Sequence, residues 1–244
     1  MTIERTAAVI VIGNEILAGK VQESNATFLI HELRELGVSL REIHVVPDEL
    51  QVIADIVAST SPRFDHLFTT GGVGPTHDDV TIPAIARGLG LELELSQEMA
   101  AVIHHFYGDD ANAHLMRMAH HPRGSTLLWD NGLQFPVLTV RNIYVFPGDP
   151  AYFQKKWLAI RHRFRTEPFH IRRIFTCCGE GEIADLLEQT ERCFPGVRIG
   201  SYPVYGNPEY EVQLTIESKE PELADQATAQ LRRGLSSDKV VREE

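Results

Sequence analysis

The sequence predicts an α/β protein, a three-layer α/β/α domain with a mostly parallel sheet, followed by a small C-terminal domain. Three successive strand-then-helix units at the start of the chain support this, because parallel strands need crossover connections that are usually helices. After Thr166-Glu167-Pro168 the order changes to β-α-β-β-α. We therefore expect domains at 1–166 and 167–235, with 236–244 as a flexible tail.

The first unit begins with the apolar run Ala7 to Ile12, which suits a strand that is buried on both faces. The following helix has apolar residues at helical spacing from Ala26 to Leu36 and ends at Gly37. Asn25 stands at the start of this helix, either as its cap or as a ligand-binding residue. Glu15 comes directly after the strand and has no evident structural role there.

The second and third units repeat this pattern. A strand from Val38 to Val46 precedes a helix that starts near Leu50, and Asp48 between them is either a helix cap or part of a site. The third strand, His66 to Thr70, precedes a helix from Val80 to Arg87. Ligands of parallel sheets collect at the carboxyl ends of the strands, so we expect the residues that follow these three strands to converge.

The loop after the third strand contains three glycines, a threonine and a pair of acids: Gly71, Gly72, Gly74, Thr76, Asp78 and Asp79. The glycines allow a close approach of the backbone to a ligand, and a helix start leaves amides unpaired, which favours phosphate. One acid can cap the helix, and the other is then free to meet the ligand. A carboxylate beside phosphate requires a bridging divalent cation, or a ligand whose ring or ribose faces the acid. Both alternatives predict a phosphorylated heterocycle.

The rest of the first domain has weaker patterns. We expect a half-exposed strand at 91–95, helices at 96–107 and 112–119, and two strands between Phe135 and Phe146. The following Pro147-Gly148-Asp149-Pro150 turn leads into a helix, Ala151 to Arg163. Pro147 and Gly148 form a second candidate wall of the pocket, or else a plain tight turn. The histidine pairs at 104–105 and 120–121 lack metal-ligand spacing, so we expect them on the surface.

The second domain is expected to contain a strand at 172–177, a helix at 183–193, strands at 198–202 and 210–217, and a helix at 222–235. Its Gly179-Glu180-Gly181-Glu182 segment is acidic, which disfavours RNA. Cys177, Cys178 and Cys193 show no C-x-x-C spacing and are expected to be reduced thiols.

The composition is that of an ordinary globular protein, with 43% hydrophobic and 23% charged residues. A formal net charge of −11 argues against nucleic-acid binding, whose affinity comes mainly from neutralising phosphates. The sequence has no apolar run near ~20 residues and no signal-peptide pattern. We therefore expect a cytoplasmic protein without membrane contact.

These segments together resemble the molybdopterin-binding family, and most of all its members of the competence/damage-inducible protein A and FAD synthase type. The matching segments are Gly13-Asn14-Glu15-Ile16-Leu17, Glu23-Ser24-Asn25, Val46-Pro47-Asp48-Glu49, Gly71 to Thr81, Val140 to Gly148 and Gly200-Ser201-Tyr202-Pro203. The resemblance implies a three-layer α/β/α domain with molybdopterin or a nucleotide as ligand. We also expect a homo-oligomer, a dimer or a trimer.

The resemblance also implies a function. In cofactor-synthesis members, acids at the positions of Asp48 and Asp79 belong to the molybdopterin site and the glycine loop receives the phosphate. The resemblance to members of the competence-protein and FAD-synthase type implies that this protein hydrolyses the pyrophosphate of ADP-ribose or FAD with a divalent metal (Co, Mg or Mn). The resemblance reaches neither the deamidase nor the nucleotidyl-transfer domain of those proteins, so neither activity is expected.

Two functions are thus predicted. The first is a metal-dependent nucleotide pyrophosphatase with Asp78 and Asp79 as catalytic and metal-binding residues. The residues expected to bind the cofactor or ligand are Gly71, Gly72, Gly74, Thr76, Glu15, Asn25, Asp48, Pro147 and Gly148. The alternative is a protein that binds molybdopterin or a nucleotide without turnover.

Overall fold

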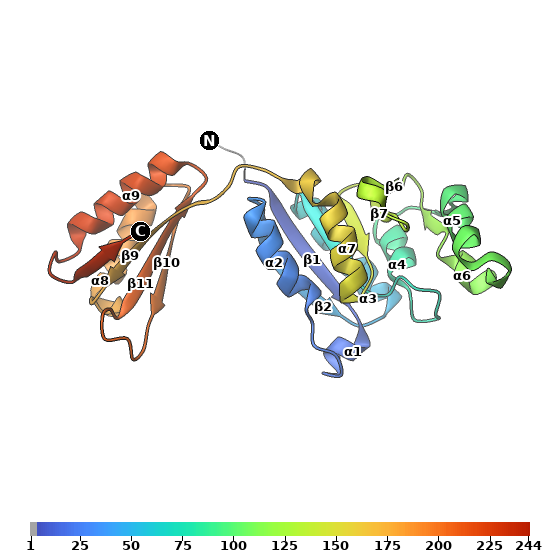
Figure 1. Ribbon diagram of the computed structural model, residues 1–244, viewed down its shortest axis with the longest axis horizontal. Coiled ribbons are helices and arrows are strands. Elements are labelled where there is room, and N and C mark those ends of the chain that lie inside the picture. The colour runs from blue at the N-terminus through green and yellow to red at the C-terminus, as the bar shows by residue number, and fades with distance from the viewer. Residues whose placement is uncertain (1–3) are drawn as a thin grey trace. The chain divides into compact units, whose positions relative to one another are not determined.

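The computed structural model describes residues 4–244, which form two compact units (Figure 1). The larger unit runs from Arg5 to Thr166, and the smaller one from Glu167 to Glu244, with Glu4 added. Separate clusters of buried hydrophobic residues support the two units. Among the described helices, none combines the length and the apolar character that crossing a bilayer would require.

The larger unit is built around a six-stranded sheet with the order β2-β1-β3-β8-β7-β6. Its strands are β1 (Thr6–Ile12), β2 (Ser39–Val46), β3 (His66–Thr70), β6 (Thr126–Leu128), β7 (Val137–Val140) and β8 (Ile143–Phe146). Strands β2, β1, β3 and β8 run parallel, and β7 and β6 continue the sheet in antiparallel pairs. The predicted mostly parallel sheet is confirmed.

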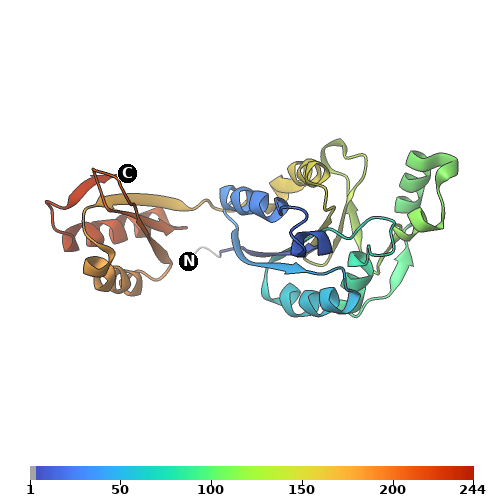
Figure 2. The same cartoon turned by 90° about the horizontal axis from the view of Figure 1, so that it is seen from below.

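Helices cover both faces of this sheet (Figure 2). α2 (Asn25–Glu35) and α7 (Pro150–Ile160) pack on one face, and α3 (Leu50–Thr60) and α4 (Thr81–Gly88) on the other. Alternate residues of β1 enter the two cores, because successive side chains of a strand point to opposite faces. Both faces are buried, which explains why the strand is apolar throughout.

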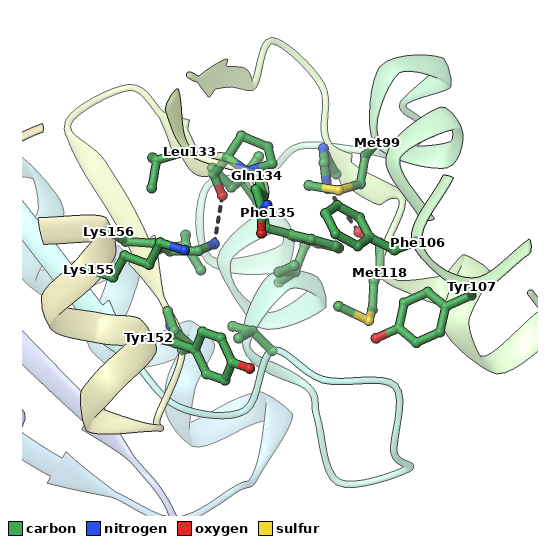
Figure 3. A pocket seen from close by; sticks show the side chains of 17 residues that line it. Met99, Phe106, Tyr107, Met118, Leu133, Gln134, Phe135, Tyr152, Lys155 and Lys156 are labelled. Carbon is green, nitrogen blue, oxygen red and sulfur yellow. Dashed lines mark hydrogen bonds between the residues drawn. The ribbon is translucent and has the colours of Figure 1, made fainter. Parts of the chain in front are cut away.

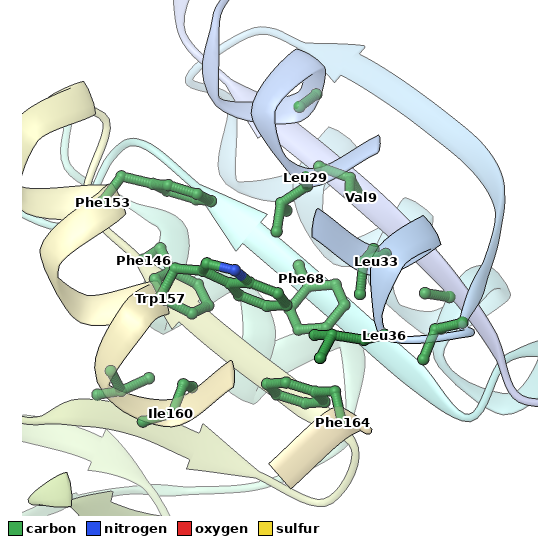
Figure 4. Close-up of a cluster of buried hydrophobic side chains, with 14 of the residues drawn as sticks. Val9, Leu29, Leu33, Leu36, Phe68, Phe146, Phe153, Trp157, Ile160 and Phe164 are labelled. Atoms are coloured by element: carbon green, nitrogen blue, oxygen red, sulfur yellow. The ribbon is translucent and has the colours of Figure 1, made fainter. Parts of the chain in front are cut away.

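Aromatic side chains dominate the core under α2 and α7 (Figure 4). Trp157 of α7 stacks on Phe164 with ring centroids 5.2 Å apart and meets Phe68 of β3 edge-on at 5.5 Å. The Trp157 indole N–H donates a hydrogen bond of 2.7 Å to Glu32 of α2, so its polar atom is satisfied. These contacts fix α7 against α2 and β3.

A small lobe of the larger unit, shown in green in Figure 1, follows α4. It consists of β4 (Leu93–Leu95), α5 (Gln97–Tyr107), α6 (Ala113–Arg117) and β5 (His120–Pro122), and β4 pairs with β5 in antiparallel fashion. The predicted surface position of His121 is wrong: the residue is 4% exposed, and burial lowers its pKa. His120 and His121 lie in a strand, so they face opposite sides, and only His120 is exposed.

The smaller unit has an antiparallel sheet with the order β10-β11-β9-β12. Its elements are β9 (His170–Thr176), α8 (Glu180–Cys193), β10 (Val197–Pro203), β11 (Val212–Ser218), α9 (Pro221–Gly234) and β12 (Val240–Glu243). The structure differs from the flexible tail expected at 236–244, because β12 pairs with the edge of β9. The guanidinium of Arg242 lies 4.0 Å from the centroid of the Phe175 ring, a favourable cation–π contact. The segment is polar because β12 is an edge strand, and edge strands often carry charged residues.

Candidate functional site

The strand ends of β1 and β2 are joined by Asp48. Its Oδ2 accepts a hydrogen bond of 2.7 Å from the amide of Asn14, which directly follows the β1 turn. Its Oδ1 lies 3.5 Å from the position that a Cβ on Gly72 would occupy, so Asp48 also reaches the glycine loop. Asp48 is not a helix cap, because the cap position of α3 is Glu49, which makes no side-chain cap bond. The carboxyl ends of three strands thus meet around one carboxylate.

Glu15 lies in the short helix α1 (Asn14–Leu17), and its side chain folds back over Gly13. The position that a Cβ on Gly13 would occupy lies 2.5 Å from Glu15 Oε1, so the carboxylate rests against the backbone of Gly13. Glu15 is exposed. Its carboxylate is therefore available at the carboxyl end of β1, as expected.

Asn25 connects β3 to the turn after β8. Its Nδ2 donates to Thr70 Oγ1 at 2.9 Å and to the Gly148 carbonyl at 2.8 Å, while Thr70 Oγ1 donates to the Pro147 carbonyl at 2.9 Å. Asn25 is 6% exposed, and the cap position of α2 is Ser24, so Asn25 does not cap this helix. In this geometry Asn25 and Thr70 hold the turn of Pro147 and Gly148, and of these two residues only Pro147 is among those that line a cavity in the described structure.

The glycines of the central loop are required by packing inside the protein. Gly71 and Gly72 have φ angles of 100° and 61°, in the left-handed region that favours glycine. A Cβ on Gly71 would lie 2.0 Å from the carbonyl oxygen of Ile12, and a Cβ on Gly72 would lie 2.5 Å from Thr81 Oγ1. The missing side chains therefore let the loop pack against β1 and α4, and do not open space for a ligand.

The amides of this loop are the groups that can meet an anion. The Gly71 amide donates to the last carbonyl of β8 at 3.2 Å. No acceptor within residues 4–244 is hydrogen-bonded to the amides of Gly72, Val73 and Gly74. Three consecutive free amides in such a loop can form an anion-binding nest. The start of α4 lies further along, where the Thr81 amide already donates to the Gly72 carbonyl at 3.1 Å.

Thr76 holds the acid pair. Its Oγ1 lies 2.6 Å from Asp78 Oδ1 and 2.5 Å from Asp79 Oδ2, and its amide donates to Asp79 Oδ2 at 2.8 Å. The hydrogen bond from the Thr76 hydroxyl lowers the pKa of Asp78 below its usual value. Neither acid caps α4, because its cap position is Val80, which has no side-chain cap bond. A Cβ on Gly74 would lie 2.7 Å from Asp79 Oδ2, so this carboxylate lies against the loop with the free amides.

The acid pair offers two carboxylates to a cation. In the part of the chain that the structure describes, no group of three or more His, Cys, Asp or Glu side chains is placed to hold a metal ion. Magnesium sites of phosphate-transferring proteins often use one or two carboxylates together with phosphate oxygens of the substrate. Asp78 and Asp79 therefore fit a divalent cation that is shared with a phosphorylated ligand.

A cavity of about 510 Å³ opens beside the glycine loop (Figure 3). Val73 and Pro147 line it on the side of the loop, and Tyr152 and Lys156 of α7 line a second side. The lobe with α5 and α6 contributes further lining residues, among them Phe106. The volume lies within the range of small-molecule pockets. Sequence reasoning identified Pro147 but missed this cavity, since its walls come from segments far apart along the chain.

Lys156 is the notable polar group of the cavity. Its Nζ donates a hydrogen bond of 2.6 Å to the Pro136 carbonyl and lies 5.7 Å from the centroid of the Phe135 ring. Burial lowers the pKa of Lys156 to about 8. No acidic side chain among residues 4–244 forms an ion pair with it.

Comparisons with known proteins agree with this architecture. Residues 8–165 match the family described as "Probable molybdopterin binding domain", and residues 168–244 match "FAD synthase, middle domain". A protein of Archaeoglobus fulgidus is 33% identical, over 81% of this chain and 86% of its own length. The probable FAD synthase of Caenorhabditis elegans is 30% identical over 95% of this chain, which spans 50% of that relative. The crystal structure of CinA from Thermoplasma acidophilum, a protein of unknown function, superposes with a TM-score of 0.61 at 27% identity, covering 66% of this chain and 100% of that one.

Proposed function

This chain belongs to the family of molybdopterin-binding domains, with a FAD synthase-type middle domain after it, and on that premise we propose a function for the Gly71–Asp79 loop. The loop binds a phosphorylated nucleotide or pterin. The protein then hydrolyses the pyrophosphate bond of a dinucleotide such as ADP-ribose or FAD, with a divalent metal.

One observation carries this proposal: free amides and a carboxylate occur together on the same loop. The amides of Gly72, Val73 and Gly74 can donate to phosphate oxygens, while Asp79 packs against Gly74. A carboxylate this close to phosphate is repelled unless a cation lies between them. A metal-assisted reaction at a phosphate would use both the free amides, which bind the phosphate, and the carboxylate, which binds the metal.

The residues of the chain have separate roles in this reaction. Gly72 to Gly74 hold the phosphate, and Thr76 orients Asp78 and Asp79. Asp78 and Asp79 would hold Co, Mg or Mn, and the metal would supply polarisation of a phosphoryl oxygen and activation of water. Asp48, beside Gly72, and Glu15, at the end of β1, offer acceptors to hydroxyl or N–H groups of the ligand.

Release of AMP tests this function. Purified protein is incubated with ADP-ribose or FAD, with magnesium or cobalt and with a chelator, and AMP is measured. We expect AMP only with metal, and a loss of about 100-fold or more in kcat/KM for Asp79→Asn, as is typical when an electrostatic group of an active site is removed. Asp55→Asn is the matched control, because Asp55 lies exposed on α3 and its carboxylate bonds only Gln51 in the described structure. Absence of AMP with every metal contradicts the proposal.

The hydrogen bonds of Thr76 support a second candidate, a protein that binds the ligand without turnover. Asp78 and Asp79 both lie within hydrogen-bond distance of the Thr76 hydroxyl, an arrangement that also serves simply to shape the loop. Calorimetry with AMP distinguishes the two. Binding that survives chelator, together with no AMP release from ADP-ribose or FAD, indicates the binding protein.

A further inference from the structure

We propose that the cavity beside the glycine loop binds the planar ring of the ligand, and that Lys156 selects rings that carry carbonyl oxygens, such as isoalloxazine or a pterin, over adenine. This inference rests on the proposed function, in which the loop amides bind the phosphate. It adds a ring site and a residue that determines specificity.

The walls of the cavity suit a flat ring. Figure 3 shows the rings of Tyr152 and Tyr107 reaching in from opposite sides, with Phe106 and the thioethers of Met99 and Met118 on the same side as Tyr107, the side of the lobe. Tyr152, Tyr107 and Phe106 are 65%, 41% and 45% exposed, so together they present aromatic surface to solvent within one cavity. Aromatic faces stack on heterocycles, and thioethers adapt to their edges. A bound ring would cover this exposed surface.

The ring site and the phosphate site share the same loop. Val73 lies between Gly72 and Gly74, so its amide belongs to the row of free donors while the residue also lines the cavity. Pro147 lines the cavity too, and its carbonyl is held by Thr70 at the end of β3. One molecule with a ring and a phosphate can therefore occupy both sites.

Lys156 gives the cavity its chemical preference. An ammonium group has three donors, and the described structure pairs the Lys156 ammonium with one acceptor, the Pro136 carbonyl. The remaining donors favour an oxygen acceptor with partial negative charge, which ring carbonyls supply. Adenine has no carbonyl oxygen and carries an amino donor at one edge. A partly buried ammonium without an acidic partner thus favours the carbonyl-bearing ring.

Packing holds Lys156 in place. The neighbouring Trp157 is fully buried and stacks on Phe164, and Phe153, one turn earlier on α7, is also fully buried. The helix therefore cannot rotate to release its lysine to solvent without opening the aromatic core. Lys155, next to it, also lines the cavity and provides the same charge on the same helix, but its side chain is exposed, so water solvates its ammonium group.

Binding of FMN and AMP tests the inference. Each ligand carries one phosphate, so the contribution of the loop cancels in the ratio of their affinities. Equilibrium dialysis gives both affinities at pH 7, and quenching of flavin fluorescence reports stacking of the ring. The wild type is expected to bind FMN more tightly than AMP and to quench its fluorescence.

The variants separate the roles of the residues. Lys156→Met is expected to weaken FMN binding by about tenfold or more, as for loss of a hydrogen bond to a charged group, and to change AMP binding by less than about twofold. Lys155→Met should leave the FMN-to-AMP ratio unchanged. Tyr152→Ala removes an exposed side chain and should reduce the quenching while the protein stays folded.

Each contrary result has a distinct meaning. An unchanged FMN-to-AMP ratio in Lys156→Met, or FMN binding without quenching in the wild type, overturns the ring site and leaves the proposed function standing. If Lys155→Met lowers the ratio of FMN affinity to AMP affinity as much as Lys156→Met does, the preference comes from general electrostatic attraction. That result overturns the specific role of Lys156. Failure of both ligands to bind the wild type overturns the ring site and the phosphate site together.

Discussion

At the scale of single residues, short polar side chains hold the walls of the candidate site. Asn25 bonds the Gly148 carbonyl across a separation of 123 positions in the chain, and Asp48 bonds the Asn14 amide across 34. The sequence predicted these residues to lie at the site, because each stands near a strand end or a helix start. It could not distinguish a ligand contact from a bond inside the protein, since the partners become neighbours only when the sheet forms.

Gly71 is expected to be the least replaceable glycine of the loop. In Gly71→Ala the new Cβ would lie 2.0 Å from the Ile12 carbonyl oxygen, in addition to the strain of φ 100°. We expect a loss of about 3 kcal/mol or more in the free energy of unfolding, measured with urea. Gly90→Ala is the matched control, because Gly90 has φ +65° with nothing within 4 Å of its Cβ position. It should cost only about 1 kcal/mol. Equal losses in the two variants would contradict a steric role for Gly71.

At the scale of elements, the order of strands and helices could be predicted, but the cavity could not. A continuous apolar run indicated β1, which is buried on both faces, and apolar residues at helical spacing indicated α2 and α3, because each of these helices buries one face. The cavity needs α7, the lobe with α5 and α6, and the segment before β7 to be placed together. Their relation follows from the hairpin of β7 and β8, which no local pattern specifies. No local pattern therefore distinguishes Lys156 from the neighbouring Lys155.

The lysine of α7 is expected to make stability depend on pH. Burial lowers the folded-state pKa of Lys156 to about 8 from 10.5, so between these values the unfolded chain binds more protons than the folded protein. The free energy of unfolding of the wild type therefore rises with pH across this window. Lys156→Met lacks this contribution and should be more stable than the wild type at pH 7, by about 1–3 kcal/mol.

Urea unfolding of the two proteins at pH 7 and near pH 10.5 measures this effect. The gap between variant and wild type should shrink as pH rises, while the other titrating groups contribute equally to both proteins. A gap that stays constant with pH would mean that the ammonium is well solvated in the folded state. Lys155→Met, which changes an exposed lysine on the same helix, is the matched control for the substitution itself.

At the scale of the whole molecule, the described site residues all belong to the larger unit. The change of pattern after Thr166 predicted a second domain of β-α-β-β-α order, and the structure contains those elements with β12 added. The sequence did not predict β12 because Val240–Glu243 is half charged, as suits an edge strand that pairs on one side only. Formation of a homo-oligomer stays a prediction.

Removal of the last nine residues tests whether β12 stabilises the smaller unit and leaves the larger unit unaffected. A chain that ends at Leu235 loses the strand pairing with β9, the hydrogen bond from Cys177 N to the Lys239 carbonyl at 2.8 Å, and the ion pair of Lys239 with Glu182 at 2.7 Å. Because β9 would then expose an unpaired edge, hydrogen exchange of its amides should accelerate by about tenfold or more. Amides of β1 should keep their rates, since β1 is paired on both sides within the larger unit. Arg242→Ala removes the contacts of this side chain with Phe175, Tyr210, Glu209 and Glu244 but keeps the strand. It should give a smaller effect in the same direction. If exchange in β9 were unchanged by the truncation, residues 236–244 would be the flexible tail that their polar composition suggests.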